Sequence, residues 1–231
     1  MLKRFLLISG SCLFAFAATG LAKADSIETY DLNVGSCCTL PSPEYFGTVT
    51  LDQVSNGSGG YNVDVTAQLY VGSNPSSPDS EFIQTGSHST FVLDTNPAIT
   101  SSQITGVTSG FSSSVGSFTQ SGFGSFNVAF NCTTCGSGAS NYPSDPTLLQ
   151  FTITDATLSD FISNSDGNYF SADIYDSLGG GNTGPVGSDG PGSMSMVPEP
   201  PSLLMLGTGL ILLATMLRRR HLPSARSVQT V

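Results

Sequence analysis

The chain has 231 residues and a formal net charge of −10 at pH 7. All seven Lys and Arg residues lie before Asp25 or after Met196, whereas every acidic residue except Glu199 lies between these positions. Because nothing in this middle segment can neutralise phosphates, nucleic-acid binding is excluded, as is adhesion to an anionic membrane surface. Its stability must come from burial, backbone hydrogen bonds and cross-links rather than from ion pairs.

The N-terminus has the pattern of an export signal. Lys3 and Arg4 give a positive start, and an apolar stretch runs from Phe5 to Ala18. Ala22-Lys23-Ala24 then supplies the small-x-small pattern that signal peptidase cleaves, so we predict a signal peptide over residues 1–24 and a mature chain that begins at Asp25. The alternative is an uncleaved N-terminal anchor.

The segment after the signal favours strands, because Gly, Ser, Thr, Asn and Pro interrupt every helical pattern. Apolar and polar residues alternate most clearly over Tyr61–Val71, which predicts a half-buried strand. Further strands are expected at Thr48–Leu51, Glu81–Thr85, His88–Leu93, Gln103–Thr108, Ser125–Cys132, Leu148–Thr154 and Tyr169–Asp176. One helical turn is expected over Leu158–Ser163, and Ser109–Gly124 reads as a long loop or hairpin.

Short strands separated by closely spaced turns predict a single all-β domain over residues 25–177, built as a β-sandwich or jelly roll. Turn residues cluster, for example, at residues 56–60 and 166–168. Residues 178–196 are rich in Gly, Ser, Asn and Pro and contain hardly an apolar side chain. We therefore predict a flexible linker there.

Four cysteines remain in the mature chain: Cys37, Cys38, Cys132 and Cys135. An even number in an exported domain predicts two disulfides. Adjacent cysteines bond to each other only with strain, so we expect each cysteine of the first pair to bond to one of the second pair. Such a bond would close a loop of almost a hundred residues and stabilise the folded state by roughly 4 kcal/mol. The alternatives are a local Cys132–Cys135 bridge beside a Cys37–Cys38 pair, a four-thiolate zinc site, and a redox pair.

Two further groups of polar residues are candidates for ligand chemistry. A calcium site is a weak candidate, because oxygen-bearing side chains cluster around a Gly turn. Its residues are Asp160, Asn164, Asp166, Asn168 and Asp173. His88, flanked by Ser87 and Ser89 and followed by Asp94, would be the base of a Ser-His-Asp hydrolase, but no G-x-S-x-G elbow is present. We assign no catalytic residue and expect no cofactor.

The C-terminal region combines three parts in a fixed order. Val197-Pro198-Glu199-Pro200 comes first, the uncharged segment Leu203–Leu217 follows, and Arg218-Arg219-Arg220 ends it. A helix over the apolar segment would be about 22–26 Å long, short of the roughly 30 Å hydrocarbon core, and flanking arginines can make up the difference. Three arginines resist translocation, which predicts an N-terminus-out, C-terminus-in transmembrane helix and a cytoplasmic tail over residues 221–231.

This arrangement over residues 197–220 resembles the PEP-CTERM sorting signal of exported bacterial proteins. The resemblance implies that an exosortase, a membrane-embedded transpeptidase-like enzyme, recognises the signal and cleaves near Pro198-Glu199-Pro200. It also implies an association with exopolysaccharide and biofilm matrix. The tail after the arginines is longer than is usual for such signals.

The sequence therefore predicts an exported, structural or interaction protein of the cell surface or extracellular matrix. The expected partners are signal peptidase, an exosortase and extracellular polysaccharide, with the membrane as a transient anchor before processing. A carbohydrate- or calcium-binding adhesion module is the alternative. A hydrolase of surface polymers is the third reading.

Overall fold

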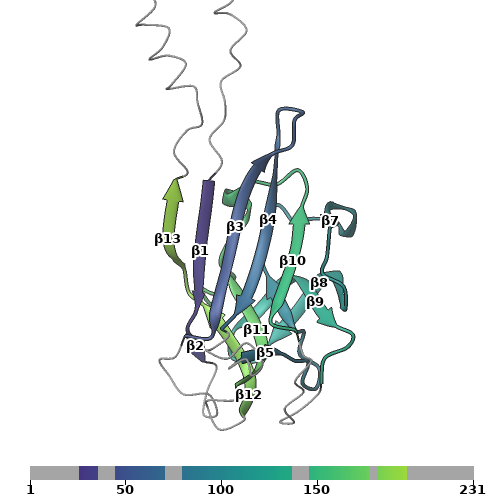
Figure 1. Ribbon diagram of the computed structural model, residues 1–231, viewed down its shortest axis with the longest axis vertical. Helices are drawn as coiled ribbons and strands as arrows, with labels where there is room; N and C mark the ends of the chain where they lie inside the picture. Colours follow the sequence, from purple (N-terminus) through teal and green to yellow (C-terminus); the bar gives the residue numbers. More distant parts are fainter. Residues whose placement is uncertain (1–25, 36–44, 71–79, 137–145, 177–181, 197–231) are drawn as a thin grey trace, which may run out of the picture. The chain divides into compact units, whose positions relative to one another are not determined.

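The computed structural model describes residues 26–35, 45–70, 80–136, 146–176 and 182–196. Asp25–Met196 form one compact unit. Within the described residues the chain is all-β, and two antiparallel sheets pack as a β-sandwich (Figure 1). The predicted fold class is confirmed at this level. The only helical elements among these residues are two 3₁₀ turns, η1 (Ser101–Gln103) and η2 (Leu158–Asp160), the second lying within the predicted helical turn.

The first sheet has six strands in the order β13-β1-β3-β4-β10-β7. Their bounds are Pro191–Met196 for β13, Ser26–Leu32 for β1, Gly47–Ser55 for β3, Tyr61–Leu69 for β4, Leu148–Ile153 for β10 and Ile104–Thr105 for β7. The second sheet has the order β2-β12-β11-β6-β9-β8, and β5 also pairs with β11. Its bounds are Val34–Gly35 for β2, Asn182–Ser188 for β12, Phe170–Asp176 for β11, Phe91–Leu93 for β6, Gly124–Cys132 for β9, Phe111–Gln120 for β8 and Ser80–Phe82 for β5.

The alternation that predicted strand β4 also determines which face of that strand is buried. Val63, Val65, Ala67 and Leu69 are buried, while the residues between them are exposed or half-buried. Successive side chains of a strand point to opposite faces, so the apolar set meets the other sheet and the polar set meets solvent. The first sheet thus buries one face only.

Aromatic rings join the two sheets across the core. Phe130 of β9 and Phe151 of β10 stack with ring centroids 4.1 Å apart, and Tyr30 of β1 meets Phe170 of β11 edge-on at 4.9 Å. All four side chains are buried. Such pairs add to the area-dependent stabilisation that each ring provides by leaving water.

A second, smaller apolar cluster covers the outer face of the second sheet. Val92, Phe123, Phe126 and Ala129 form it. The β8–β9 hairpin supplies three of these residues, so the stretch predicted as a long loop or hairpin forms a strand hairpin of this sheet, and its turn brings Phe123 onto the outer face. Phe123 lies against Gly187, where a Cβ would run into the ring.

The predicted linker over residues 178–196 is wrong where the structure describes it, because residues 182–196 form β12 and β13. Strand β12 lies between β2 and β11, and Pro185, Val186, Gly187 and Ser188 are buried there. Small residues are suited to this position because Phe123 packs directly on the strand. The domain predicted to end at residue 177 therefore extends to Met196, and Leu178–Gly181 lie outside the described residues.

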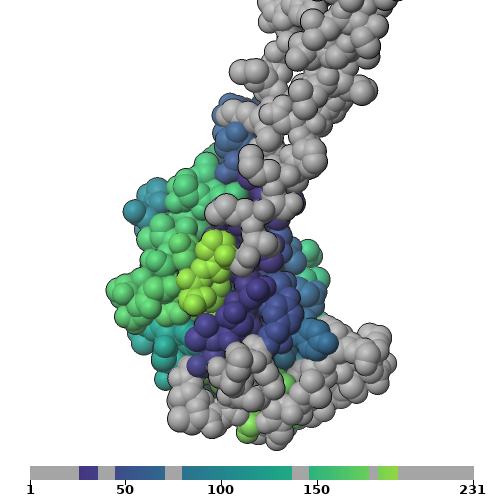
Figure 2. All heavy atoms as spheres, turned by 90° about the vertical axis from the view of Figure 1, so that its left-hand side faces the viewer, coloured from purple at the N-terminus to yellow at the C-terminus, as the bar shows by residue number. Residues whose placement is uncertain are grey.

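The first and last strands of the domain are neighbours. Strand β13 pairs with β1 so that Ser26 lies opposite Met196, and the pairing continues to Tyr30 opposite Pro191. Figures 1 and 2 both show the two strands side by side. The two ends of the compact unit therefore meet at one edge of the first sheet.

Candidate ligand-binding site

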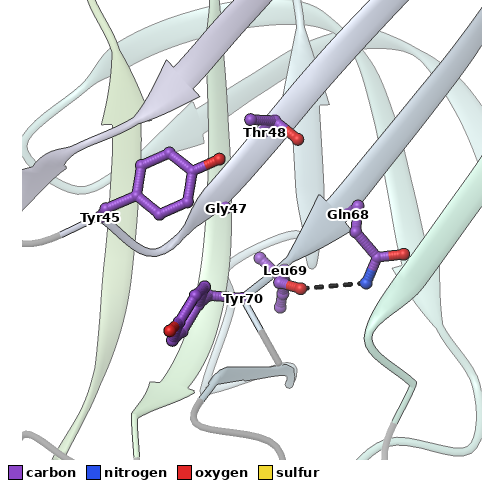
Figure 3. Close-up of a pocket in the computed structure, with 6 residues that line it drawn as sticks. All are labelled: Tyr45, Gly47, Thr48, Gln68, Leu69 and Tyr70. Carbon is purple, nitrogen blue, oxygen red and sulfur yellow. Dashed lines mark hydrogen bonds between the residues drawn. The ribbon is translucent and has the colours of Figure 1, made fainter. Parts of the chain in front are cut away.

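A hollow of about 400 Å³ lies where β3 begins and β4 ends. It is lined by Tyr45, Gly47, Thr48, Gln68, Leu69 and Tyr70, which Figure 3 shows together. The two tyrosines contribute its exposed aromatic surface. Tyr45 is 50% exposed and Tyr70 is 43% exposed.

Local backbone pairing brings the two tyrosines together. The Tyr70 N–H donates to the Phe46 carbonyl oxygen at 2.7 Å, and Gly47 lies opposite Leu69 in the β3–β4 register. A Cβ at Gly47 would run into the Gln68 carbonyl and lie 2.8 Å from the Leu69 Cα, so only glycine permits this close approach. The Tyr45 and Tyr70 rings meet edge-to-face, with centroids 6.1 Å apart at 77°.

Two neutral polar side chains complete the lining. Thr48 and Gln68 lie directly opposite each other on β3 and β4. The Gln68 amide nitrogen donates to the Leu69 carbonyl at 2.9 Å and to the Thr147 carbonyl at 3.0 Å. These bonds fix the orientation of the amide.

The charge beside the hollow is negative. Asp31 on β1 lies directly opposite Thr48 on β3, so a carboxylate, a hydroxyl and an amide follow one another across three strands on the outer face of the first sheet. No Lys or Arg occurs between Asp25 and Met196. An anionic ligand would therefore meet repulsion here and no compensating cation.

The predicted pairing of Cys37 and Cys38 with the second cysteine pair is wrong, because Cys132 and Cys135 bond to each other. Their Cα atoms are 5.4 Å apart, and the Cys135 N–H donates to the Cys132 sulfur at 3.0 Å. Residues 132–135 form a turn at the end of β9, which brings the two sulfurs within bonding reach. The local bridge that we kept as an alternative is confirmed, and Cys37 and Cys38 lie outside the described residues.

The five calcium candidates lie in three separate environments. The Asp160 carboxylate accepts from the Thr157 N–H at 2.8 Å and so caps η2. Asn164 and Asn168 both donate their side-chain amides to the Phe123 carbonyl, at 2.6 and 3.2 Å. Asp166 follows in the same turn, where its N–H donates to the Asn164 side-chain oxygen at 3.0 Å.

The fifth candidate, Asp173, lies on β11 and bonds to Thr85 rather than to the Asn164–Asn168 turn. No group of three His, Cys, Asp or Glu side chains that could hold a metal ion occurs among the described residues. The donors of the turn are amide nitrogens directed at a protein carbonyl, which is the arrangement of a structural turn rather than of a cation site.

The residues around His88 do not form a hydrolase triad. The electrostatic partner of His88 is Asp173, whose pKa is raised by burial and lowered in part by hydrogen bonds from Thr85 and by the His88 charge. Burial also raises the pKa of Asp94, against the opposing effect of backbone hydrogen bonds from Thr95 and Asn127. Asp94 and His88 thus belong to different local networks.

The residues of both predicted processing sites lie outside the described part of the chain. Ala22, Ala24 and Asp25 precede β1, and Val197–Pro200 and Arg218–Arg220 follow β13. No helix among the described residues is long and apolar enough to cross a membrane, and the predicted spanning segment Leu203–Leu217 is not among them.

Sequence reasoning missed the paired tyrosines. Tyr45 precedes one strand and Tyr70 follows the next, and their proximity depends on the antiparallel register of β3 and β4. A signal was present, since Tyr70 lies in the polar, solvent-facing set of the predicted strand Tyr61–Val71. Comparison of the chain with family models, with curated proteins and with solved structures gives no significant match.

Proposed function

We propose that this chain is an exported interaction protein of the cell surface or extracellular matrix, sorted and processed by an exosortase at its C-terminal Pro-Glu-Pro signal. In this proposal residues 1–24 are removed by signal peptidase, and the segment Leu203–Leu217 anchors the chain until processing. The described part then acts by binding rather than by catalysis.

One observation supports this proposal most directly. The compact unit extends from Asp25 to Met196, so it begins directly after the expected signal-peptidase site and ends directly before Val197. All Lys and Arg residues lie outside these bounds. A folded domain bounded so closely by two targeting signals is what an exported passenger requires.

The test is to express the full chain in a Gram-negative host that has an exosortase and to identify both ends of the exported protein by mass spectrometry. We expect an N-terminus at Asp25 and a C-terminus near Pro198-Glu199-Pro200. Replacing these three residues by alanine should retain the unprocessed chain in the inner membrane. The control Pro223→Ala, in the tail, should be processed normally. Recovery of the intact chain from the cytosol would contradict the proposal.

A second candidate function is carbohydrate binding, and the exposed pair Tyr45–Tyr70 favours it. The calcium-binding version has no comparable support, because its candidate residues lie in separate environments.

A further inference from the structure

We propose that Tyr45 and Tyr70 form a stacking site for a segment of a neutral polysaccharide chain, with Thr48 and Gln68 binding its hydroxyl groups. The inference rests on the proposed function in one respect: it gives the exported interaction protein its ligand class.

The tyrosine rings provide the apolar surface that a sugar needs. One face of a pyranose ring consists of C–H groups, which pack on an aromatic ring and leave water together with it. Tyr45 and Tyr70 are two of the three large apolar side chains that are more than one-third exposed among the described residues. They are also in contact with each other, so their exposed area forms one patch.

Contacts within the protein hold the lining groups of the site in position. The edge-to-face contact of the rings, the bond from the Tyr70 N–H to the Phe46 carbonyl and the close backbone approach at Gly47 limit movement of both tyrosines. The Gln68 amide is held by two carbonyl oxygens. Binding to such a site loses less conformational entropy than binding to loose side chains.

The ligand is assigned as neutral because of the charges nearby. Asp31 lies one strand from Thr48, and the segment Asp25–Met196 supplies no Lys or Arg that could pair with a carboxylate or sulfate group. Asp31 would attract a cation, but none of the six lining residues is a carboxylate and two rings at 77° do not enclose an ion. The polar groups of the lining are the neutral Gln68 amide and the Thr48 hydroxyl. A sugar uses both the ring faces and these polar groups.

The ligand is assigned as a polymer segment because the hollow is open. Tyr45 and Tyr70 remain about half exposed, at 50% and 43%, so the site covers one side of a ligand and leaves the other in solvent. An open site of this kind admits an internal segment of a long chain, whereas small free ligands are usually enclosed on most sides.

The test is affinity electrophoresis of the full chain, purified in detergent, in native gels that contain dextran, laminarin, galactomannan or, as an acidic probe, alginate. We expect at least one neutral polysaccharide to retard the protein and alginate to have no effect. Tyr45→Ala and Tyr70→Ala should each weaken retardation about five- to tenfold, as expected for loss of one stacking partner. Tyr45→Phe and Tyr70→Phe keep the ring and should stay within about threefold of the parent.

The matched control is Val115→Ala, which changes the third exposed apolar side chain, on β8 of the other sheet, and should leave retardation unchanged. Equal melting temperatures of all variants would show that the fold is intact. The inference is overturned if no neutral polysaccharide retards the protein, if only alginate does, or if the alanine variants bind like the parent. Because this assay uses purified protein, its result is independent of whether the chain is sorted in cells as proposed.

Discussion

Thr85 holds one oxygen of the Asp173 carboxylate with two hydrogen bonds. Its backbone N–H and its hydroxyl both donate to Oδ2 at 2.6 Å. The other oxygen, Oδ1, is buried and has no hydrogen-bond partner among the described residues, and Asp173 itself is fully buried. Burial therefore outweighs the bonds from Thr85 and raises the pKa of Asp173 above its usual value of 3.8.

This relationship predicts the pH dependence of stability. Because the pKa is higher in the folded than in the unfolded state, the folded protein holds this proton more tightly, and the free energy of unfolding should fall as pH rises from about 4 through the folded pKa. Asp173→Asn should flatten this slope in urea titrations between about pH 4 and pH 7. Asp189→Asn, at an exposed turn position, is the control and should keep the slope. If the slope is unchanged in Asp173→Asn, the pH dependence of the free energy of unfolding comes from another group, and Asp94 is the next residue to test.

Phe151 should be among the most sensitive core positions. Its ring stacks on Phe130 of the opposite sheet at 4.1 Å and also lies 6.4 Å from Phe91. Phe151→Ala removes these contacts and leaves a cavity between the sheets, which should lower the free energy of unfolding by about 3–5 kcal/mol. Urea denaturation measures this, and a loss below about 1 kcal/mol would contradict the described core.

The contact between Gly187 and Phe123 gives a double-mutant test. A Cβ at Gly187 would run into the Phe123 ring, so Gly187→Ala should destabilise the protein by about 1–3 kcal/mol through overpacking. In a Phe123→Ala background the same substitution should cost almost nothing, because the ring is gone. Additive effects in thermal or urea unfolding would show that the hairpin does not lie on β12.

The Cys132–Cys135 bridge should contribute little to stability. The loop that it closes is four residues long, for which the chain-entropy model gives about 2 kcal/mol, against roughly 4–5 kcal/mol for a loop of about a hundred residues. Replacing both cysteines by serine should therefore lower the free energy of unfolding by no more than about 2 kcal/mol. Peptide mapping without reduction should recover Cys132 and Cys135 in a single peptide that carries an internal disulfide. A disulfide from either residue to Cys37 or Cys38 would contradict this pairing.

Strands that carry alternating apolar residues were predictable from sequence, and β4 is the clearest case. Strands β12 and β13 were not, because Gly, Ser and Pro in them have the composition of a linker. Strand β12 is instead held by backbone pairing on both sides, with Phe123 packed on Gly187. Pairing partners distant in sequence override local propensity here.

The candidate site was less predictable than the fold. Tyr45 and Tyr70 are ordinary residues in the sequence, and they become a pair only through the register of β3 and β4. The calcium candidates had the opposite outcome. They are close in sequence, apart from Asp173, but Asn164 and Asn168 donate their side-chain amides to the Phe123 carbonyl and the Asp160 carboxylate caps η2. Local sequence spacing does not specify where side-chain donors point.

The pairing of β13 with β1 has a consequence for the order in which the chain folds. A polypeptide that emerges from its N-terminus cannot complete the second sheet until β12 has been made, nor close the edge of the first sheet until Met196 follows. Contacts between such remote segments form late and slowly. The nascent chain therefore remains incompletely folded until nearly all of residues 25–196 has been synthesised. If the chain is exported as proposed above, this delay would keep it unfolded enough to pass through a translocation channel.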